Sequence, residues 1–262
     1  MNFEALFQEG VVANVRINDS VLALSERAAL AWLVRRVPPA VTPDHLTSLG
    51  LAGALFTASG FICCWWSNWF LLAVVFGLFL NWIGDSLDGT LARYRKIERA
   101  HYGYFIDHSA DLIAQTLIVV GLGFSPFFTI PSALLVLSLY LLMSSYTYLR
   151  VVTESVHRLS YGGMGATEFR ILVASWALFA AWVGPAIATG RIFSFLGLDV
   201  VIGVLSACTF FGFVWIVRND LTRLQREERI ALRKKARAAE RAGRQDALFE
   251  LPTTDLAEQI AQ

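Results

Sequence analysis

The chain has 262 residues, a formal net charge of +1 and a hydrophobic content of 56%. With a mean hydropathy of +0.54, this apolar content exceeds that of soluble domains and excludes an ordinary water-soluble enzyme. The net charge itself says little, because the distribution of the basic residues carries the information. No nucleic-acid partner is expected.

Residues 20–36 combine an apolar stripe with Trp32 and a basic end. This pattern predicts a helix that lies in the membrane interface. An ordinary amphipathic helix packed on other helices fits the same pattern equally well. Thr42 and Pro43, which follow shortly afterwards, predict the start of the next helix.

Six apolar stretches follow, and each has or approaches the ~20 residues that a helix needs to cross a bilayer. They are Leu46–Trp66, Trp69–Ile83, Tyr104–Phe124, Phe127–Tyr148, Ile171–Thr189 and Ile192–Val217. Because the second stretch is short, its helix is predicted to continue into the polar residues that follow. The sequence thus predicts an all-α integral membrane protein with six transmembrane helices.

The basic residues that flank these stretches predict their orientation. They precede the first span, separate the second from the third and the fourth from the fifth, and follow the sixth, whereas the three opposite loops contain only Arg191. Under the positive-inside rule, both termini face the cytoplasm. We expect a cytoplasmic segment at residues 1–41, a six-helix domain at 42–217 and a charged cytoplasmic tail at 218–262.

Four acids lie around the second loop, at Asp85, Asp88, Asp107 and Asp111. Residues three or four apart share one face of a helix, so each pair of acids is predicted to lie on one face. The connection between the two spans is short, which predicts antiparallel neighbours whose acidic faces meet on the cytoplasmic side. Carboxylates beside hydrocarbon are costly and indicate a functional site.

The acid cluster needs compensating charge, and no basic residue within the apolar stretches is expected to supply it. Two divalent cations would do so, and carboxylate oxygens suit Mg²⁺ or Mn²⁺. Paired metals are a recurrent device for phosphoryl chemistry. Gly89 and Gly103 would then admit a substrate close to the backbone, and Arg93 would contact phosphate. Tight helix packing is the alternative for the glycines, and positive-inside charge is the alternative for Arg93.

The complete pattern resembles the signature of the CDP-alcohol phosphotransferase family. Its eight specified positions are Asp85, Asp88, Gly89, Ala92, Arg93, Gly103, Asp107 and Asp111. A match of this length at fixed spacing is specific. Pro43 and Thr47 also resemble an element that often precedes the family's first span, although Asp44 replaces the family's Asn.

The resemblance implies transfer of a substituted phosphate from a CDP-linked alcohol to an acceptor alcohol, with release of CMP. It implies that the four acids hold two divalent cations and that Asp111 also removes the proton of the acceptor hydroxyl. Residues implied to line the CDP site are Thr47, Gly89, Ala92, Arg93 and Gly103. Family members are often dimers, so a homodimer is a further expectation.

The acceptor and the donor stay open at this point. CDP-diacylglycerol with a polar alcohol is slightly favoured, in the inner membrane of a microbe. CDP-choline or CDP-ethanolamine with diacylglycerol is the alternative. An ion or proton transporter is the rival class, and a purely structural ion cluster is the remaining interpretation of the acids.

Several other polar residues lie near the helix ends and in the loops. His101 and His108 are predicted to be solvated or hydrogen-bonded rather than metal ligands. Glu168 suits the N-terminal turn of the fifth span. The following residues would line an acceptor pocket or belong to a solvated loop: Glu154, His157, Arg158 and Arg170.

Overall fold

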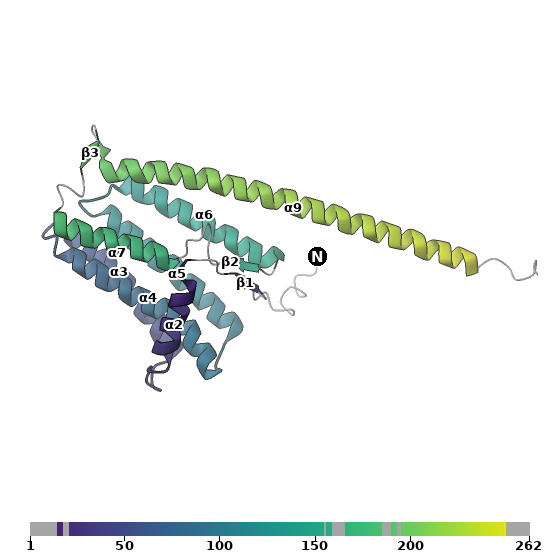
Figure 1. The fold of residues 1–262 in the computed structure, drawn as a ribbon, viewed down its shortest axis with the longest axis horizontal. Coiled ribbons are helices and arrows are strands. Elements are labelled where there is room, and N and C mark those ends of the chain that lie inside the picture. The colour runs from purple at the N-terminus through teal and green to yellow at the C-terminus, as the bar shows by residue number, and fades with distance from the viewer. Residues whose placement is uncertain are drawn as a thin grey trace, which may run out of the picture. The chain divides into compact units, whose positions relative to one another are not determined.

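The computed structural model describes residues 15–17, 21–154, 156–158, 166–184, 190–192 and 195–249 (Figure 1). The helices are α2 (Ala23–Val34), α3 (Pro43–Cys63), α4 (Phe70–Arg95), α5 (Ala100–Gly123), α6 (Ile130–Glu154), α7 (Ala166–Val183) and α9 (Gly197–Phe249). Two short strand pairs accompany them, and neither was predicted. Strand β1 (Val15–Ile17) runs parallel to β2 (Val156–Arg158), and β3 (Arg191–Ile192) runs antiparallel to β4 (Phe195–Leu196).

Six helices in the described part of the chain are long and apolar enough to cross a membrane. They are α3, α4, α5, α7 and the segments Ile130–Thr153 of α6 and Gly197–Ala238 of α9. This confirms the prediction of a multi-pass helical membrane protein. The short second stretch does continue as one helix through the acidic residues, because α4 ends only at Arg95.

The start of α3 is fixed by local hydrogen bonds, as predicted. Thr42 is the N-cap, and its hydroxyl accepts the backbone N–H of His45 at 3.3 Å. The His45 side chain in turn accepts the backbone N–H of Thr42 at 3.3 Å. Pro43 follows in the first turn, where its missing N–H costs nothing.

Helices α3 and α4 pack with their backbones in contact. A Cβ atom added to Gly53 would lie 2.5 Å from the backbone nitrogen of Asn81, and one added to Gly84 would meet the backbone of Gly50. Such small residues let membrane helices approach closely. A Cβ on Gly50 would lie 3.3 Å from the backbone nitrogen of Asp85, so this contact holds the first acid of the cluster against α3.

Helix α2 packs on α4 beside the acidic segment. Leu30 and Val34 of α2 share one buried cluster with Leu46 of α3 and with Leu87 and Leu91 of α4. These contacts agree with the packed-helix interpretation of residues 20–36. The depth of α2 in the membrane interface stays a prediction.

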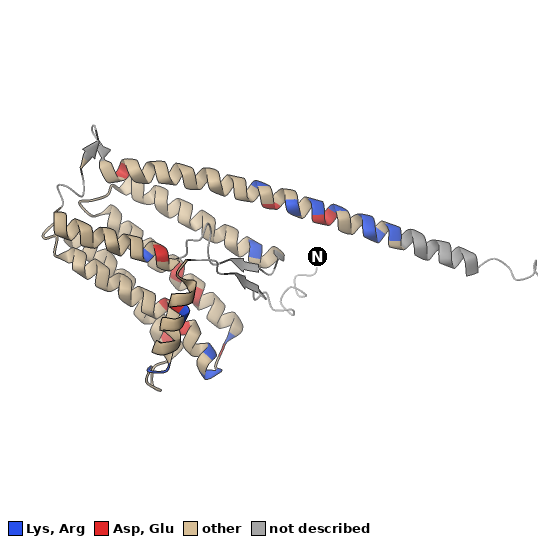
Figure 2. Cartoon of the chain, in the orientation of Figure 1, with Lys and Arg blue, Asp and Glu red and all other residues tan. Residues whose placement is uncertain are grey.

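The chain divides into two units, Met1–Thr209 and Phe210–Gln262. The described part of the second unit is a continuous helix, the C-terminal portion of α9. Figure 2 shows Lys and Arg residues, mixed with acidic residues, along the middle of α9. Helix α9 continues without a break through residue 218, where the sequence predicted the start of the charged tail. That domain boundary stays a prediction.

Candidate active site

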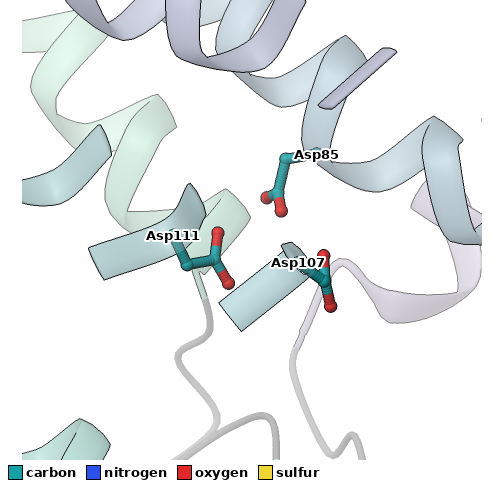
Figure 3. A group of neighbouring side chains, drawn as sticks. All are labelled: Asp85, Asp107 and Asp111. Atoms are coloured by element: carbon teal, nitrogen blue, oxygen red, sulfur yellow. The ribbon is translucent and has the colours of Figure 1, made fainter. Parts of the chain in front are cut away.

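Three carboxylates converge between α4 and α5. Asp85 comes from α4, and Asp107 and Asp111 come from successive turns of α5 (Figure 3). Each offers one ligand oxygen, and these oxygens all lie within 4.8 Å of one another. The structure therefore brings together acids that lie 26 residues apart along the chain, as the helical spacing predicted.

Asp88 lies one turn further along α4 and has its own partners. One of its oxygens accepts the hydroxyl of Thr47 at 2.5 Å, and the other accepts the backbone N–H of Gly89 at 2.5 Å. Its exposed fraction is only 6%. A buried carboxylate with both oxygens engaged has a fixed orientation, and Thr47 of α3 is the residue that provides it.

A small cavity joins Asp88 to the other three acids. Its lining consists of Thr47, Gly50, Leu51, Asn81, Asp85, Asp88, Asp107, Ala110, Asp111 and Ala114. Helices α3, α4 and α5 all contribute to it, so all four acids of the signature face one common space.

Arg170 corrects the expectation that no basic residue neutralises the acids. It lies in the first turns of α7, is 5% exposed, and donates from Nη2 to Asp85 at 2.6 Å. Its Nε donates to the side-chain oxygen of Asn81 at 2.9 Å. The solvated-loop interpretation is therefore wrong for Arg170, because a buried guanidinium requires such charged and polar partners.

The two glycines of the signature do not pack against another helix. Among the described residues, no atom lies within 4 Å of the position that a Cβ on Gly103 would take. At Gly89 the nearest atoms belong to the Arg93 guanidinium, at 3.3 Å. Tight helix packing therefore does not explain these two glycines, whereas it does explain Gly53 and Gly84. Ala92 is half-buried on α4 and directly precedes Arg93.

Asp44, which departs from the family's pattern, pairs with a basic residue of the connection between α4 and α5. Arg99 donates to its carboxylate, and both side chains are partly exposed. This hydrogen bond raises the pKa of Arg99 above its ordinary value. The acid at position 44 therefore links the start of α3 to the connection between α4 and α5.

The structure describes the side chains of some of the remaining polar candidates. His101 is exposed, and His108 has its Nδ1 2.9 Å from the carbonyl of Tyr104 and its ring stacked on that of Tyr104. Glu168 lies in the first turn of α7, as predicted. The side chains of three further candidates lie outside the described residues: Glu154, His157 and Arg158.

The role of Asn81 and the pairing of Arg170 with Asp85 were not predicted from the sequence. Both carried a usable signal, because a polar side chain within or at the end of an apolar span is costly and needs a partner. Helical spacing alone could not pair Asn81 with Arg170, because it relates residues within one helix. Asn81 belongs to α4, whereas Arg170 belongs to α7.

Comparison with known proteins identifies the family. Residues 40–217 match the family described as CDP-alcohol phosphatidyltransferase. The chain is 26% identical over 204 residues to cholinephosphotransferase 1 of Gallus gallus, which covers 71% of this chain and 58% of that protein. It is 40% identical over 87 residues to the inner membrane protein YnjF of Escherichia coli, 32% of this chain and 37% of that protein.

A third relative, cholinephosphotransferase 1 of Danio rerio, is 30% identical over 98 residues, 34% of this chain and 25% of that protein. The chain thus spans little more than half of the longest-matched relative and less of the other two. The family match covers the whole region from α3 to the middle of α9, including all eight positions of the signature. This chain is a member of the CDP-alcohol phosphatidyltransferase family.

Proposed function

We propose that this protein is a metal-dependent CDP-alcohol phosphotransferase of phospholipid biosynthesis. It transfers a substituted phosphate from a CDP-linked alcohol to an acceptor alcohol and releases CMP. The observation that carries the proposal is the convergence of Asp85, Asp107 and Asp111 at 4.8 Å or less, at the motif positions of the matched family. Asp88 faces the same cavity.

The acid cluster fits two divalent cations, with Mg²⁺ and Mn²⁺ as the candidates. All donors are carboxylate oxygens, the ligands that hard cations prefer. Four carboxylates and the Arg170 guanidinium leave a net charge of about −3, which one divalent cation would not neutralise. Asp85, Asp88, Asp107 and Asp111 would hold the ions. When bound, such ions neutralise the diphosphate and stabilise charge on the leaving oxygen.

The donor site is proposed beside Gly89 and the open face of Gly103. The Arg93 guanidinium lies over Gly89, where it presents a planar cation to an incoming phosphate. The open space at Gly103 would accept the cytidine part of the donor without a steric clash. Ala92, three residues after Gly89 on α4, has a small side chain that would leave room for the donor. Thr47 contributes by orienting Asp88 through the 2.5 Å hydrogen bond.

Asp111 is the proposed general base. It accepts the proton of the acceptor hydroxyl as the hydroxyl oxygen attacks the phosphorus that carries the non-nucleoside alcohol. The bond from that phosphorus to the oxygen of CMP breaks, and CMP leaves with the bonding electrons. Asp111 then releases its proton to water, which restores the carboxylate.

Two donor classes remain, and different observations support each. The two relatives named cholinephosphotransferase 1 support CDP-choline or CDP-ethanolamine with diacylglycerol. The family description names phosphatidyl transfer, which supports CDP-diacylglycerol with a small polar alcohol, the slightly favoured prediction from the sequence. Arg170 is buried beside the cavity, but its guanidinium already donates to Asp85. Because that charge is paired, it does not favour the binding of a phosphorylated acceptor at that position.

An assay of CMP release with Mg²⁺ or Mn²⁺ tests the proposal. One arm pairs CDP-choline or CDP-ethanolamine with diacylglycerol, and the other pairs CDP-diacylglycerol with a panel of polar alcohols. CMP release in either arm supports the transferase, and the active arm assigns the donor. Ion flux across proteoliposomes without CMP release in either arm would instead support a transporter.

The membrane orientation is part of the same proposal. The basic residues place the acid cluster at the cytoplasmic side under the positive-inside rule, and one relative is named an inner membrane protein. We therefore propose an active site that faces the cytoplasm from the inner membrane of a microbe. A homodimer stays a prediction from the resemblance.

Filling the open face of Gly103 is expected to impair donor binding while sparing the fold. In the Gly103→Leu variant the new side chain enters space where no described atom lies within 4 Å. We expect the KM for the CDP-linked donor to rise about tenfold or more, since a steric clash of this size costs ~1–3 kcal/mol. Steady-state CMP release against donor concentration measures this, with thermal unfolding as the control. An unchanged KM would place the donor elsewhere.

A further inference from the structure

Glu26 of α2 is a polar junction that the proposed mechanism does not use. Its Oε1 accepts the indole N–H of Trp82 at 3.0 Å, the hydroxyl of Ser86 at 3.3 Å and the hydroxyl of Thr167 at 2.7 Å. Trp82 and Ser86 belong to α4, and Thr167 belongs to the first turn of α7. One half-buried carboxylate oxygen therefore connects three helices.

The two helices that Glu26 connects also carry the Asp85–Arg170 ion pair. Ser86 directly follows Asp85 on α4, and Thr167 precedes Arg170 by three residues, about one turn, on α7. A second contact fixes the same end of α7, because the Glu168 carboxylate accepts the backbone N–H of Leu22 at 2.9 Å. Helix α2 therefore holds the first turn of α7 through two neighbouring residues.

The position of this turn decides where the Arg170 guanidinium can reach. An arginine side chain has many rotamers, and its hydrogen bonds are strong only in a narrow geometry. In the structure that geometry is met, with Nη2 2.6 Å from Asp85 and Nε 2.9 Å from Asn81. A shift of the first turn of α7 would lengthen both contacts together, since both donors belong to one planar group.

We propose that Glu26 is a positioning residue that sets the Arg170 guanidinium against Asp85 and thereby sets the affinity of the acid cluster for divalent cations. This inference rests on the proposed function only in that the acid cluster binds metal. It assigns to the N-terminal helix α2 a role in the site, through contacts that do not involve membrane binding.

The sign of the effect follows from the charge on Arg170. The guanidinium engages one oxygen of Asp85 and repels an incoming cation at short range, where the low dielectric strengthens the repulsion. Removing this charge in Arg170→Gln should lower the dissociation constant for Mn²⁺ about tenfold or more. Glu26→Leu should lower it in the same direction, about threefold or more, because Arg170 loses its fixed position.

The test is a Mn²⁺ titration of the purified full chain without substrate, by calorimetry or by electron paramagnetic resonance. Four proteins form a double-mutant cycle: the wild type, Glu26→Leu, Arg170→Gln and the double variant. If Glu26 acts through Arg170, the double variant has the same Mn²⁺ affinity as Arg170→Gln alone. Glu26→Gln is the matched control, since its side-chain oxygen still accepts hydrogen bonds, and it should bind Mn²⁺ as the wild type does.

Three results would overturn the inference. They are an unchanged Mn²⁺ affinity in Glu26→Leu, independent and additive effects in the double variant, and no Mn²⁺ binding by the wild type. Thermal unfolding checks that each variant is folded, and Thr167→Val, which removes one donor to Glu26, replaces Glu26→Leu if that variant does not fold. A parallel CMP-release assay of the wild type separates this outcome from failure of the proposed function, because the Mn²⁺ titration needs no turnover.

Discussion

Asp111→Asn is expected to lower the rate of CMP release about 10²–10⁴-fold, the usual contribution of a general base. The variant keeps the size of the side chain on α5 but loses the negative charge and the ability to take a proton. Since the Asp111 oxygen lies within 4.8 Å of those of Asp85 and Asp107, the loss of one of three crowded charges should not destabilise the folded protein. Initial rates at saturating donor, together with thermal unfolding, measure both effects.

Asp199→Asn provides the matched control for this substitution. Asp199 accepts hydrogen bonds from the backbone and the hydroxyl of Thr129, both at 3.2 Å, at the start of α9. It is absent from the lining of the acid cavity. CMP release by Asp199→Asn should stay within about twofold of the wild type, because this half-buried side chain lies away from the acid cavity and asparagine keeps an oxygen that accepts hydrogen bonds. A wild-type rate in Asp111→Asn would remove Asp111 from the mechanism.

Gly84→Ala is expected to destabilise the folded protein strongly, because an added Cβ at Gly84 makes the shortest contact found at any described glycine. The new Cβ would meet the backbone of Gly50 and the carbonyl of Leu46. Backbone atoms cannot rotate away as a side chain does, so α3 and α4 must separate, at a cost of ~1–3 kcal/mol or more. The movement would also displace Asp85, which follows Gly84 directly, so CMP release should fall with stability.

Gly103→Ala is the control for this prediction, because it adds the same methyl group to a helical glycine with open space beside it. Replacing a helical glycine by alanine stabilises by ~0.5–1 kcal/mol where no clash occurs. Thermal unfolding of the two variants in the same detergent should therefore give shifts of opposite sign. Equal midpoints would contradict the close approach of α3 and α4.

The sequence predicted the parts of the site that depend on spacing within one helix. Asp85 and Asp88 are three residues apart and Asp107 and Asp111 are four apart, so helical periodicity alone placed each pair on one face. The short α4–α5 connection then predicted that the faces meet. The helix start at Pro43 was predictable for the same reason, because a capping motif involves only neighbouring residues.

The contacts between helices distant in sequence were not predictable in this way. Arg170 lies 85 residues from Asp85, and no periodicity relates α7 to α4. The glycine contact did leave a signal, since Gly53 and Gly60 of α3 and Gly77 and Gly84 of α4 each recur after seven residues, which is typical of closely packed membrane helices. Glu26 left none, because one acid on an amphipathic helix normally faces water.

Metal-dependent CMP release by the purified chain tests the central claim most directly. The protein is treated with a chelator, and CMP release is then measured with a CDP-linked alcohol and its acceptor before and after Mg²⁺ or Mn²⁺ is added. We predict no release from the chelated protein, release on addition of either ion, and no such recovery in Asp111→Asn. CMP release that persists at full rate after chelation, or that never appears with either donor class, would contradict a metal-dependent phosphotransferase built on these acids.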